Sequence, residues 1–582
     1  MDVETNRQRA MERRDFGYYE ARNRGCYRDV KSKDITSCKG NASILQRLRA
    51  SLQVLDISDH HVYNHFVVGE GDDLGWLGYF IGKSKYLYDL RITSWGEGEN
   101  IEAFIEGINR NQSINSLHIG TDLRGVSFRN LRPFFRNNNN LYQLEFNFEV
   151  GLECAESIAF VLDENRCQSL ESLRFEDCNL GEDGFAVIAT ALRTYPELEE
   201  LHLQHNNIGL MGCTALADTL RGWEASNLKH LDLDGNGIDD QGLQTLAAGI
   251  TNTKLEELHL QHNNIGLMGC TALADTLRGW EASNLKHLDL DGNSIDDQGL
   301  QVLAAGVTNT KLEELYLSDN LITGAGLRSM SDYFQSESCC LKTLNVLRND
   351  FGDEGAVALA DGLIGNKSLT SLCFHPHQSG ITRIGWAAFS RLLCDTSSIN
   401  STYLSNHNIR TIGFGYDGAP LDIRHYLEMN KHPHPAMNKI LKSHPDLDIE
   451  PFFQWKLKLL PVVVNWFQSA GSRMLANNLG ESIQRQSLQN RELSALYKFV
   501  RGMPDLTVMS YWQQFVMNAQ AERRRIDDER RRLEDERRRL DGERCKLDYD
   551  EEAAWVRLGG RPRSEGEGSS NFVSGVKRRR QE

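Results

Sequence analysis

The chain has 582 residues, of which 40% are hydrophobic and 25% are charged, and Asp and Glu outnumber Lys and Arg to give a net charge of −16. This composition is sufficient to bury a core, and it excludes a collagen-like or wholly disordered chain. The acidic balance argues against a protein body that binds nucleic acid, because such a body needs a basic face to meet phosphate.

The N-terminal segment, residues 1–45, is rich in Arg and Lys and contains no apolar run of secretory-signal length, so we predict a basic, poorly ordered segment there. The longest uncharged apolar-rich stretch has 14 residues from Leu459, fewer than the ~18 that a membrane-spanning helix needs. The 12 cysteines show no paired spacing apart from the adjacent Cys339 and Cys340, as expected for thiols in a reducing compartment. These features predict a cytoplasmic protein without a membrane span.

Residues 46–414 repeat a pattern with a period of 27 to 30 residues over most of its length. In each unit, LxxLxLxxN provides the alternating apolar residues of a short strand, and stretches such as LxALADTL place apolar residues at helical spacing. We therefore predict an α/β solenoid of about 13 strand–helix repeats. The first apolar residues of the predicted units are Leu52, Leu87, Ile114, Leu141, Leu170, Leu198, Leu228, Leu255, Leu285, Leu312, Leu341, Leu369 and Ile399.

An asparagine closes the strand pattern in the central units, where its side chain can both donate and accept hydrogen bonds as the chain leaves the strand. We expect these residues to stack as a ladder: Asn206, Asn236, Asn263, Asn293, Asn320 and Asn349. Cys178, His377 and His407 take the same place in three other units.

This pattern resembles the leucine-rich repeat family in its ribonuclease-inhibitor-like subtype, which implies a horseshoe-shaped solenoid. The segment LSALYKFVRGMPDL resembles one that follows the repeats in the expanded leucine-rich repeat families of unicellular algae. The same repeat subtype occurs in the activator of the nuclear-transport GTPase. The resemblance therefore leaves regulation of a small GTPase as an alternative function.

Residues 198–254 and 255–311 are 57-residue copies that differ at three positions only. Such an insertion is tolerated where each repeat contacts mainly its neighbours, and it suits an active site assembled from distant parts of the chain far less well. We therefore predict a non-enzymatic interaction protein with no catalytic residues.

Three motif look-alikes fail on their spacing. The glycines of the loop-like sequence at Gly78–Ser84 are one residue too close for a phosphate-binding loop. The calcium-like sequence that starts at Asp232 has Leu243 where an acidic twelfth ligand is needed. Histidines between prolines, such as His432 and His434, offer no readable ligand geometry. We predict no cofactor and no metal site.

In a strand, alternate residues point to the same side, and parallel pairing brings equivalent residues of neighbouring strands into rows. Residues 170–311 hold 22 Asp and Glu against 8 Lys and Arg. This excess favours an acidic concave face that binds a basic protein or peptide, with no role for nucleic acid. In the other interpretation, the alternation only keeps like charges apart on neighbouring strands. The predicted contact residues are Glu200, His202, His230, Asp232, Asp234, Glu257, His259, His287, Asp289, Asp291, Glu314 and Tyr316.

Beyond the repeats, apolar residues at helical spacing predict a helical capping segment over 415–515. Residues 516–556 contain a seven-residue charged repeat with one apolar residue per heptad, half of what a coiled-coil seam requires. We expect a protruding charged helix and a monomer, with a weak coiled-coil homodimer as the alternative. The Gly- and Ser-rich tail, 557–582, is predicted to be disordered, and its basic run Lys577–Arg580 is a candidate nuclear-import signal.

Overall fold

The computed structural model describes residues 39–444, except 59–64, 69–72, 95–99, 123–126, 166–168, 224–226, 252, 281–283 and 414–418, together with four residues between 531 and 539. The chain divides into two compact units, Met1–Asp446 and Leu447–Glu582. The predicted tail, nearly all of the charged heptad segment and most of the predicted cap therefore lie outside the described residues. Among the described helices, none is long and apolar enough to cross a membrane.

In the described part of the first unit, fourteen parallel strands form one open sheet, in the order β14-β13-β12-β11-β10-β9-β8-β7-β6-β5-β4-β3-β1-β2. The strands are β1 (Val54–Ser58), β2 (His65–Val67), β3 (Asp89–Ile92), β4 (Ser116–Ile119), β5 (Gln143–Phe146), β6 (Ser172–Phe175), β7 (Glu200–His202), β8 (His230–Asp232), β9 (Glu257–His259), β10 (His287–Asp289), β11 (Glu314–Tyr316), β12 (Thr343–Asn345), β13 (Ser371–Cys373) and β14 (Thr411–Ile412).

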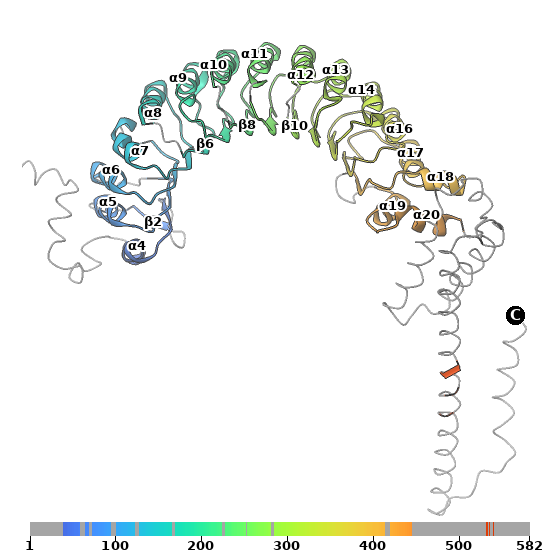
Figure 1. Cartoon of the computed structure of the whole chain (residues 1–582), viewed down its shortest axis with the longest axis horizontal. Helices are drawn as coiled ribbons and strands as arrows, with labels where there is room; N and C mark the ends of the chain where they lie inside the picture. Colours follow the sequence, from blue (N-terminus) through green and yellow to red (C-terminus); the bar gives the residue numbers. More distant parts are fainter. Residues whose placement is uncertain are drawn as a thin grey trace, which may run out of the picture. The chain divides into compact units, whose positions relative to one another are not determined.

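From β2 onward, helices connect successive strands, as is usual for parallel pairing, and they cover the outer side of the strand stack in this unit (Figure 1). The helices are α4 (Lys39–Ala50), α5 (Asp73–Lys83), α6 (Ile101–Arg110), η1 (Phe128–Leu131), α7 (Arg132–Asn137), α8 (Leu152–Asn165), α9 (Gly181–Leu192), α10 (Gly209–Arg221), α11 (Asp240–Ile250), α12 (Leu267–Gly279), α13 (Asp297–Val307), α14 (Gly324–Ser329), α15 (Ser331–Gln335), α16 (Gly352–Gly362), α17 (Arg383–Leu393), α18 (Ile399–Leu404), α19 (Leu421–Asn430) and α20 (Pro435–Ser443).

The core lies between the sheet and the helices. The central residue of each three-residue strand is an apolar side chain that is fully buried, such as Leu201, Leu231 and Leu258. Because neighbouring strand residues point to opposite sides, the residues that flank these leucines face away from the helices. The predicted α/β solenoid of strand–helix repeats is confirmed, and its leucines fix which strand residues line the inner face.

The asparagine ladder is confirmed. Asn236 is fully buried; its side-chain nitrogen donates to the carbonyls of Leu203 (2.8 Å) and Asp234 (3.0 Å), and its oxygen accepts from the backbone N–H of Asn206 (3.1 Å). Cys178 takes the equivalent place in its repeat, with Sγ 3.2 Å from the carbonyl of Phe146. Each ladder residue therefore ties its own turn to the preceding repeat.

The structure corrects the predicted units at the C-terminal end. Residues from Ile399 form helix α18 and not a strand, and the last strand, β14, begins at Thr411. The helix begins there because the Ser398 hydroxyl accepts a hydrogen bond from the Ser401 N–H and caps it. His377 is exposed and His407 follows α18, so neither closes a strand as the ladder asparagines do.

Two further differences concern the N-terminal repeats. Strand β2 (His65–Val67) pairs with β1 at the sheet edge, an additional strand that the repeat pattern did not predict. The loop-like sequence at Gly78–Ser84 runs through helix α5, where its backbone N–H groups are engaged in helical hydrogen bonds and cannot surround a phosphate. The rejection of a phosphate-binding loop is therefore supported by the local structure.

Candidate functional site

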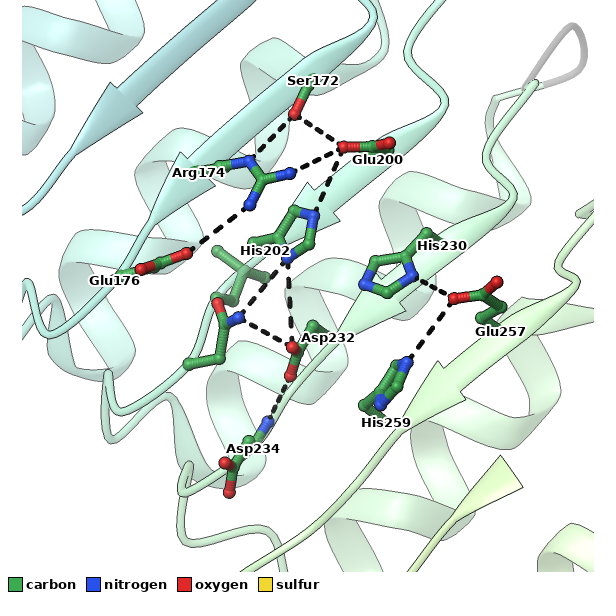
Figure 2. Close-up of polar contacts among 12 residues, drawn as sticks. Ser172, Arg174, Glu176, Glu200, His202, His230, Asp232, Asp234, Glu257 and His259 are labelled. Carbon is green, nitrogen blue, oxygen red and sulfur yellow. Dashed lines mark hydrogen bonds and ion pairs between the residues drawn. The ribbon is translucent and has the colours of Figure 1, made fainter. Parts of the chain in front are cut away.

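The strand register brings the predicted contact residues into the rows expected from the sequence. Glu200, His230, Glu257, His287 and Glu314 are direct partners from strand to strand, and we call them the outer row. The inner row consists of His202, Asp232, His259, Asp289 and Tyr316, paired in the same way. Figure 2 shows the first three strands of this arrangement, β7 to β9.

The two rows differ in exposure. The glutamate side chains of the outer row are about half exposed, with 45% for Glu200, 51% for Glu257 and 42% for Glu314. In the inner row, the side chain of Asp232 is only 14% exposed, and Asp289 is buried. The negative charge that a partner would meet first is therefore carried by the glutamates.

The inner-row aspartates are held by hydrogen bonds that repeat in the two copies. Asp232 accepts from the side-chain amide of Gln204 at 2.7 Å and from the N–H of Asp234 at 3.1 Å. In the second copy, Asp289 accepts from Gln261 at 2.9 Å and from the N–H of Asp291 at 3.0 Å. These bonds compensate for part of the cost of burying a carboxylate.

Each outer-row glutamate also has a partner. Glu200 forms an ion pair with Arg174 at 2.9 Å, and Glu257 accepts from Nδ1 of His230 at 2.8 Å. His287 and Glu314 repeat that contact at 3.0 Å. A glutamate with one such partner keeps further lone pairs for a ligand.

The aromatic rings of the two rows form one continuous column. Successive ring centroids lie 4.5 Å apart for His202 and His230, 4.8 Å for His230 and His259, 4.6 Å for His259 and His287, and 4.9 Å for His287 and Tyr316. The column zigzags because the ring comes from the inner row on odd-numbered strands and from the outer row on even-numbered ones.

Burial controls the protonation of this surface. Burial lowers the pKa of the His202 and His259 imidazoles to about 4, so both rings are neutral at physiological pH. Burial raises the pKa of the Asp289 carboxyl to about 6 and also raises that of Asp232. For Glu257, burial opposes ionisation, but the hydrogen bond from His230 and the attraction of the neighbouring histidines together outweigh it and leave the pKa below its usual value.

The sequence located the rows but missed two side chains. Gln204 and Gln261 bond to the inner-row aspartates, yet neither was among the predicted contact residues. Their position two residues after His202 and His259, on the same side of the strand line, is the signal that points to them. Whether the twelve predicted residues contact a partner remains a prediction.

These features define a class of protein: an open α/β solenoid whose parallel strands line one face and present variable side chains in rows. A family model described as "Leucine Rich repeat" matches residues 196–217, 224–247, 251–274, 281–304, 308–331 and 337–360. The chain is a leucine-rich repeat protein, and its repeats are of the ribonuclease-inhibitor-like subtype.

Curated relatives match the repeat region. The ribonuclease inhibitor of Sus scrofa is 28% identical over 228 residues, which is 34% of this chain and 49% of that protein. NACHT, LRR and PYD domains-containing protein 12 of Mus musculus is 25% identical over 353 residues, covering 54% of this chain and 33% of that protein. The chain thus spans about half the length of the inhibitor and less of the larger relative.

Solved structures are similar at a lower level. An internalin of Listeria monocytogenes covers 60% of this chain and 91% of its own, with 17% identity and a TM-score of 0.35. A chain of the Rad7 and Elc1 complex of yeast covers 59% of this chain and 80% of its own, with 14% identity and the same TM-score. At these scores the assignment of the fold comes from the repeats themselves and not from the two structures.

Proposed function

We propose that the chain is a non-enzymatic binding protein that holds a basic protein or peptide against the outer row. The observation that carries this proposal is the line of half-exposed glutamates, Glu200, Glu257 and Glu314, on every second strand. Complementary charge of this kind accelerates encounter and selects the partner. The similarity to ribonuclease inhibitors, whose name describes action on another protein, supports a protein ligand.

The spacing of these glutamates restricts the partner. Strands in a sheet are about 4.8 Å apart, so carboxylates on every second strand are separated by about 10 Å. Basic residues seven apart on a helix are also about 10 Å apart. We therefore expect the partner to present Lys or Arg at that interval along one face.

The inner-row aspartates have a different role in this proposal. Asp232 and Asp289 are largely buried and already hydrogen-bonded, so they contribute to the negative field and make no direct contact. A field from several like charges attracts a partner before contact and weakens as salt is added.

The test compares two variants with the same change in charge. The site variant carries Glu200→Gln, Glu257→Gln and Glu314→Gln. The control carries Asp218→Asn, Asp275→Asn and Glu354→Gln on helices α10, α12 and α16, where these side chains are 59% to 66% exposed. The probe is a helical peptide with Arg at every seventh position, against the same peptide with Gln.

Exposed ion pairs contribute about 0.2–1 kcal/mol each, so three should change affinity by about 3-fold to 140-fold. We expect the site variant to lose affinity for the Arg peptide in this range and to show a weaker salt dependence, while the control retains both. Equal binding of the Arg peptide by the wild type and the site variant would contradict the proposal, as would an equal loss in the control.

A further inference from the structure

Histidine and carboxylate side chains converge on the inner face in three groups. The groups are His202, His230 and Asp232; His230, Glu257 and His259; and His259, His287 and Asp289. In each group, one ligand-type atom per residue lies within 4.8 Å of the others. Figure 2 shows the first two groups on strands β7 to β9.

We propose that the first and the third group each bind one divalent transition-metal ion of the zinc class, so that the chain holds two such ions. These two groups share no residue, and each member of the first has its counterpart 57 positions later in the third, within the nearly identical copies. The middle group shares His230 with the first and His259 with the third. A neutral imidazole offers one lone pair to a metal, so the middle group competes with both of the others.

The unsatisfied atoms of these histidines support the proposal independently of the clustering. The Nδ1 atoms of His230 and His287 donate to Glu257 and Glu314, so Nε2 of each ring carries the lone pair. These two Nε2 atoms are buried without a hydrogen bond to any described residue. His202 contributes its other ring nitrogen to the first group, since Nδ1 lies 3.9 Å from Asp232 Oδ2 while Nε2 lies 3.5 Å from Glu200 Oε2. A buried ring nitrogen without a hydrogen bond is costly, and a metal ion is one partner that satisfies it.

An amide donor already lies between two of the proposed ligands. The Gln204 side-chain nitrogen is 2.7 Å from Asp232 Oδ2 and 3.4 Å from His202 Nδ1, while its own oxygen is buried without a hydrogen bond. Gln261 repeats this arrangement with Asp289 and His259 at 2.9 and 3.3 Å. In both copies, a histidine nitrogen and an aspartate oxygen therefore face the same glutamine amide nitrogen, and a cation in the place of that amide would meet both acceptors.

The donor atoms select the kind of ion. Two imidazoles and one carboxylate are a zinc-type set that leaves a fourth position for water or another ligand. Ca²⁺ and Mg²⁺ require about six oxygen ligands, which neither group supplies. Ligand atoms around a tetrahedral ion with bonds of about 2.0–2.1 Å are about 3.3 Å apart, so binding draws the side chains together and displaces the amide of Gln204 or Gln261.

The series of three histidine and carboxylate groups does not continue onto strands β6 and β11, because the equivalent inner-row residues there are not metal ligands. Arg174, on strand β6, pairs with His202 in the register of the inner row, and its guanidinium bonds to Glu200. Tyr316, on β11, stands 57 positions after His259 and so replaces the next histidine. A guanidinium cannot ligate a cation, and burial raises the pKa of the Tyr316 hydroxyl to about 12, which keeps it protonated.

The experiment titrates the full chain, stripped with a chelator, with Zn²⁺ and with Ca²⁺ as the negative probe, and counts ions by calorimetry. Co²⁺ replaces Zn²⁺ for a second readout, since its visible absorption reports four-coordinate geometry. The site variant is His202→Asn with His259→Asn, and a second variant is Asp232→Asn with Asp289→Asn. The matched control is His205→Asn with His262→Asn, because these histidines are exposed in the same two copies and their left-handed backbone accepts Asn.

We expect two Zn²⁺ per wild-type chain and per control chain, and no heat from Ca²⁺. Loss of supporting residues alone weakens metal binding about 10-fold to 100-fold, so loss of a direct ligand should weaken it at least 100-fold in both variants. Unchanged binding in the site variant, or an equal loss in the control, would overturn the proposal. One ion per chain, lost on Glu257→Gln, would also overturn it and assign binding to the middle group.

This test uses no peptide partner and does not rest on the proposed function. The glutamate variant of the outer row keeps all six ligands of the first and third groups. Failure of zinc binding therefore leaves the peptide result as it stands, and failure of peptide binding leaves the zinc result as it stands.

Discussion

Replacing Asn236 by Ala should destabilise the repeats strongly although the change removes only a few atoms. The side-chain oxygen of Asn236 accepts hydrogen bonds from the buried N–H groups of Asn206 at 3.1 Å and Ile208 at 3.4 Å. A buried donor that loses its acceptor costs about 1–3 kcal/mol. Two such donors predict a loss of about 2–6 kcal/mol in the free energy of unfolding, before the bonds to Leu203 and Asp234 are considered.

Urea unfolding followed by circular dichroism measures the loss, with Asn264→Ala as the control because Asn264 is exposed. Exposed substitutions usually change stability by less than about 0.5 kcal/mol. Hydrogen exchange adds a local readout. The amides of Asn206 and Ile208 should lose protection, while those of β12 keep theirs, because distant repeats couple only through their neighbours. A loss below about 1 kcal/mol, or exchange that increases evenly along the array, would refute the ladder as a source of stability.

Two further predictions concern pH and packing. Burial lowers the pKa of Lys439 from 10.5 to about 7, although its ammonium donates to the carbonyls of Leu393 and Asn406. The unfolded chain then binds the extra proton between pH 7 and 10.5, so the unfolding free energy of the wild type relative to Lys439→Met should rise across that window. If the difference in unfolding free energy between the two proteins does not change with pH, the Lys439 ammonium is exposed to solvent and this prediction is wrong. Gly306→Ala should cost at least about 1 kcal/mol, since the new Cβ would lie 2.5 Å from Cα of Ala274, whereas Gly279→Ala meets nothing within 4 Å and should be neutral or slightly stabilising in thermal melts. Equal melting temperatures for the two glycine variants would contradict this.

The regular part of the fold could be predicted because two independent signals mark the strand of each repeat, namely the alternating leucines and the ladder asparagine. Leu231 and Asn236 together fix the strand, its inward face and its end. At Ile399 the same spacing was misleading, because two apolar residues fit the strand template while Ser398 starts a helix. Apolar spacing alone does not distinguish a strand from a helical turn over six residues.

How deeply each carboxylate side chain is buried could not be predicted from the row in which it lies. Asp232 and Glu257 both follow the repeat pattern, but only Asp232 accepts a hydrogen bond from a glutamine in the turn of the preceding repeat. That contact joins residues 28 positions apart, and it depends on side-chain length, which the leucine period does not constrain. The row prediction therefore gave the correct neighbours but did not separate exposed from buried carboxylates.

Some contacts of the inner face join the two 57-residue copies and lie within neither of them. His202, His230 and Asp232 lie within the first copy, and their counterparts lie within the second. The His230 and His259 rings, whose centroids lie 4.8 Å apart, are in contact across the boundary between the copies at residue 255, and so are His230 and Glu257. A single copy followed by Tyr316 would hold a column of two histidines, because the tyrosine would occupy the place of His259. Two adjacent copies of the 57-residue segment, in register, therefore produce the continuous column of four histidines. The same arrangement makes the middle group compete with the first and the third group.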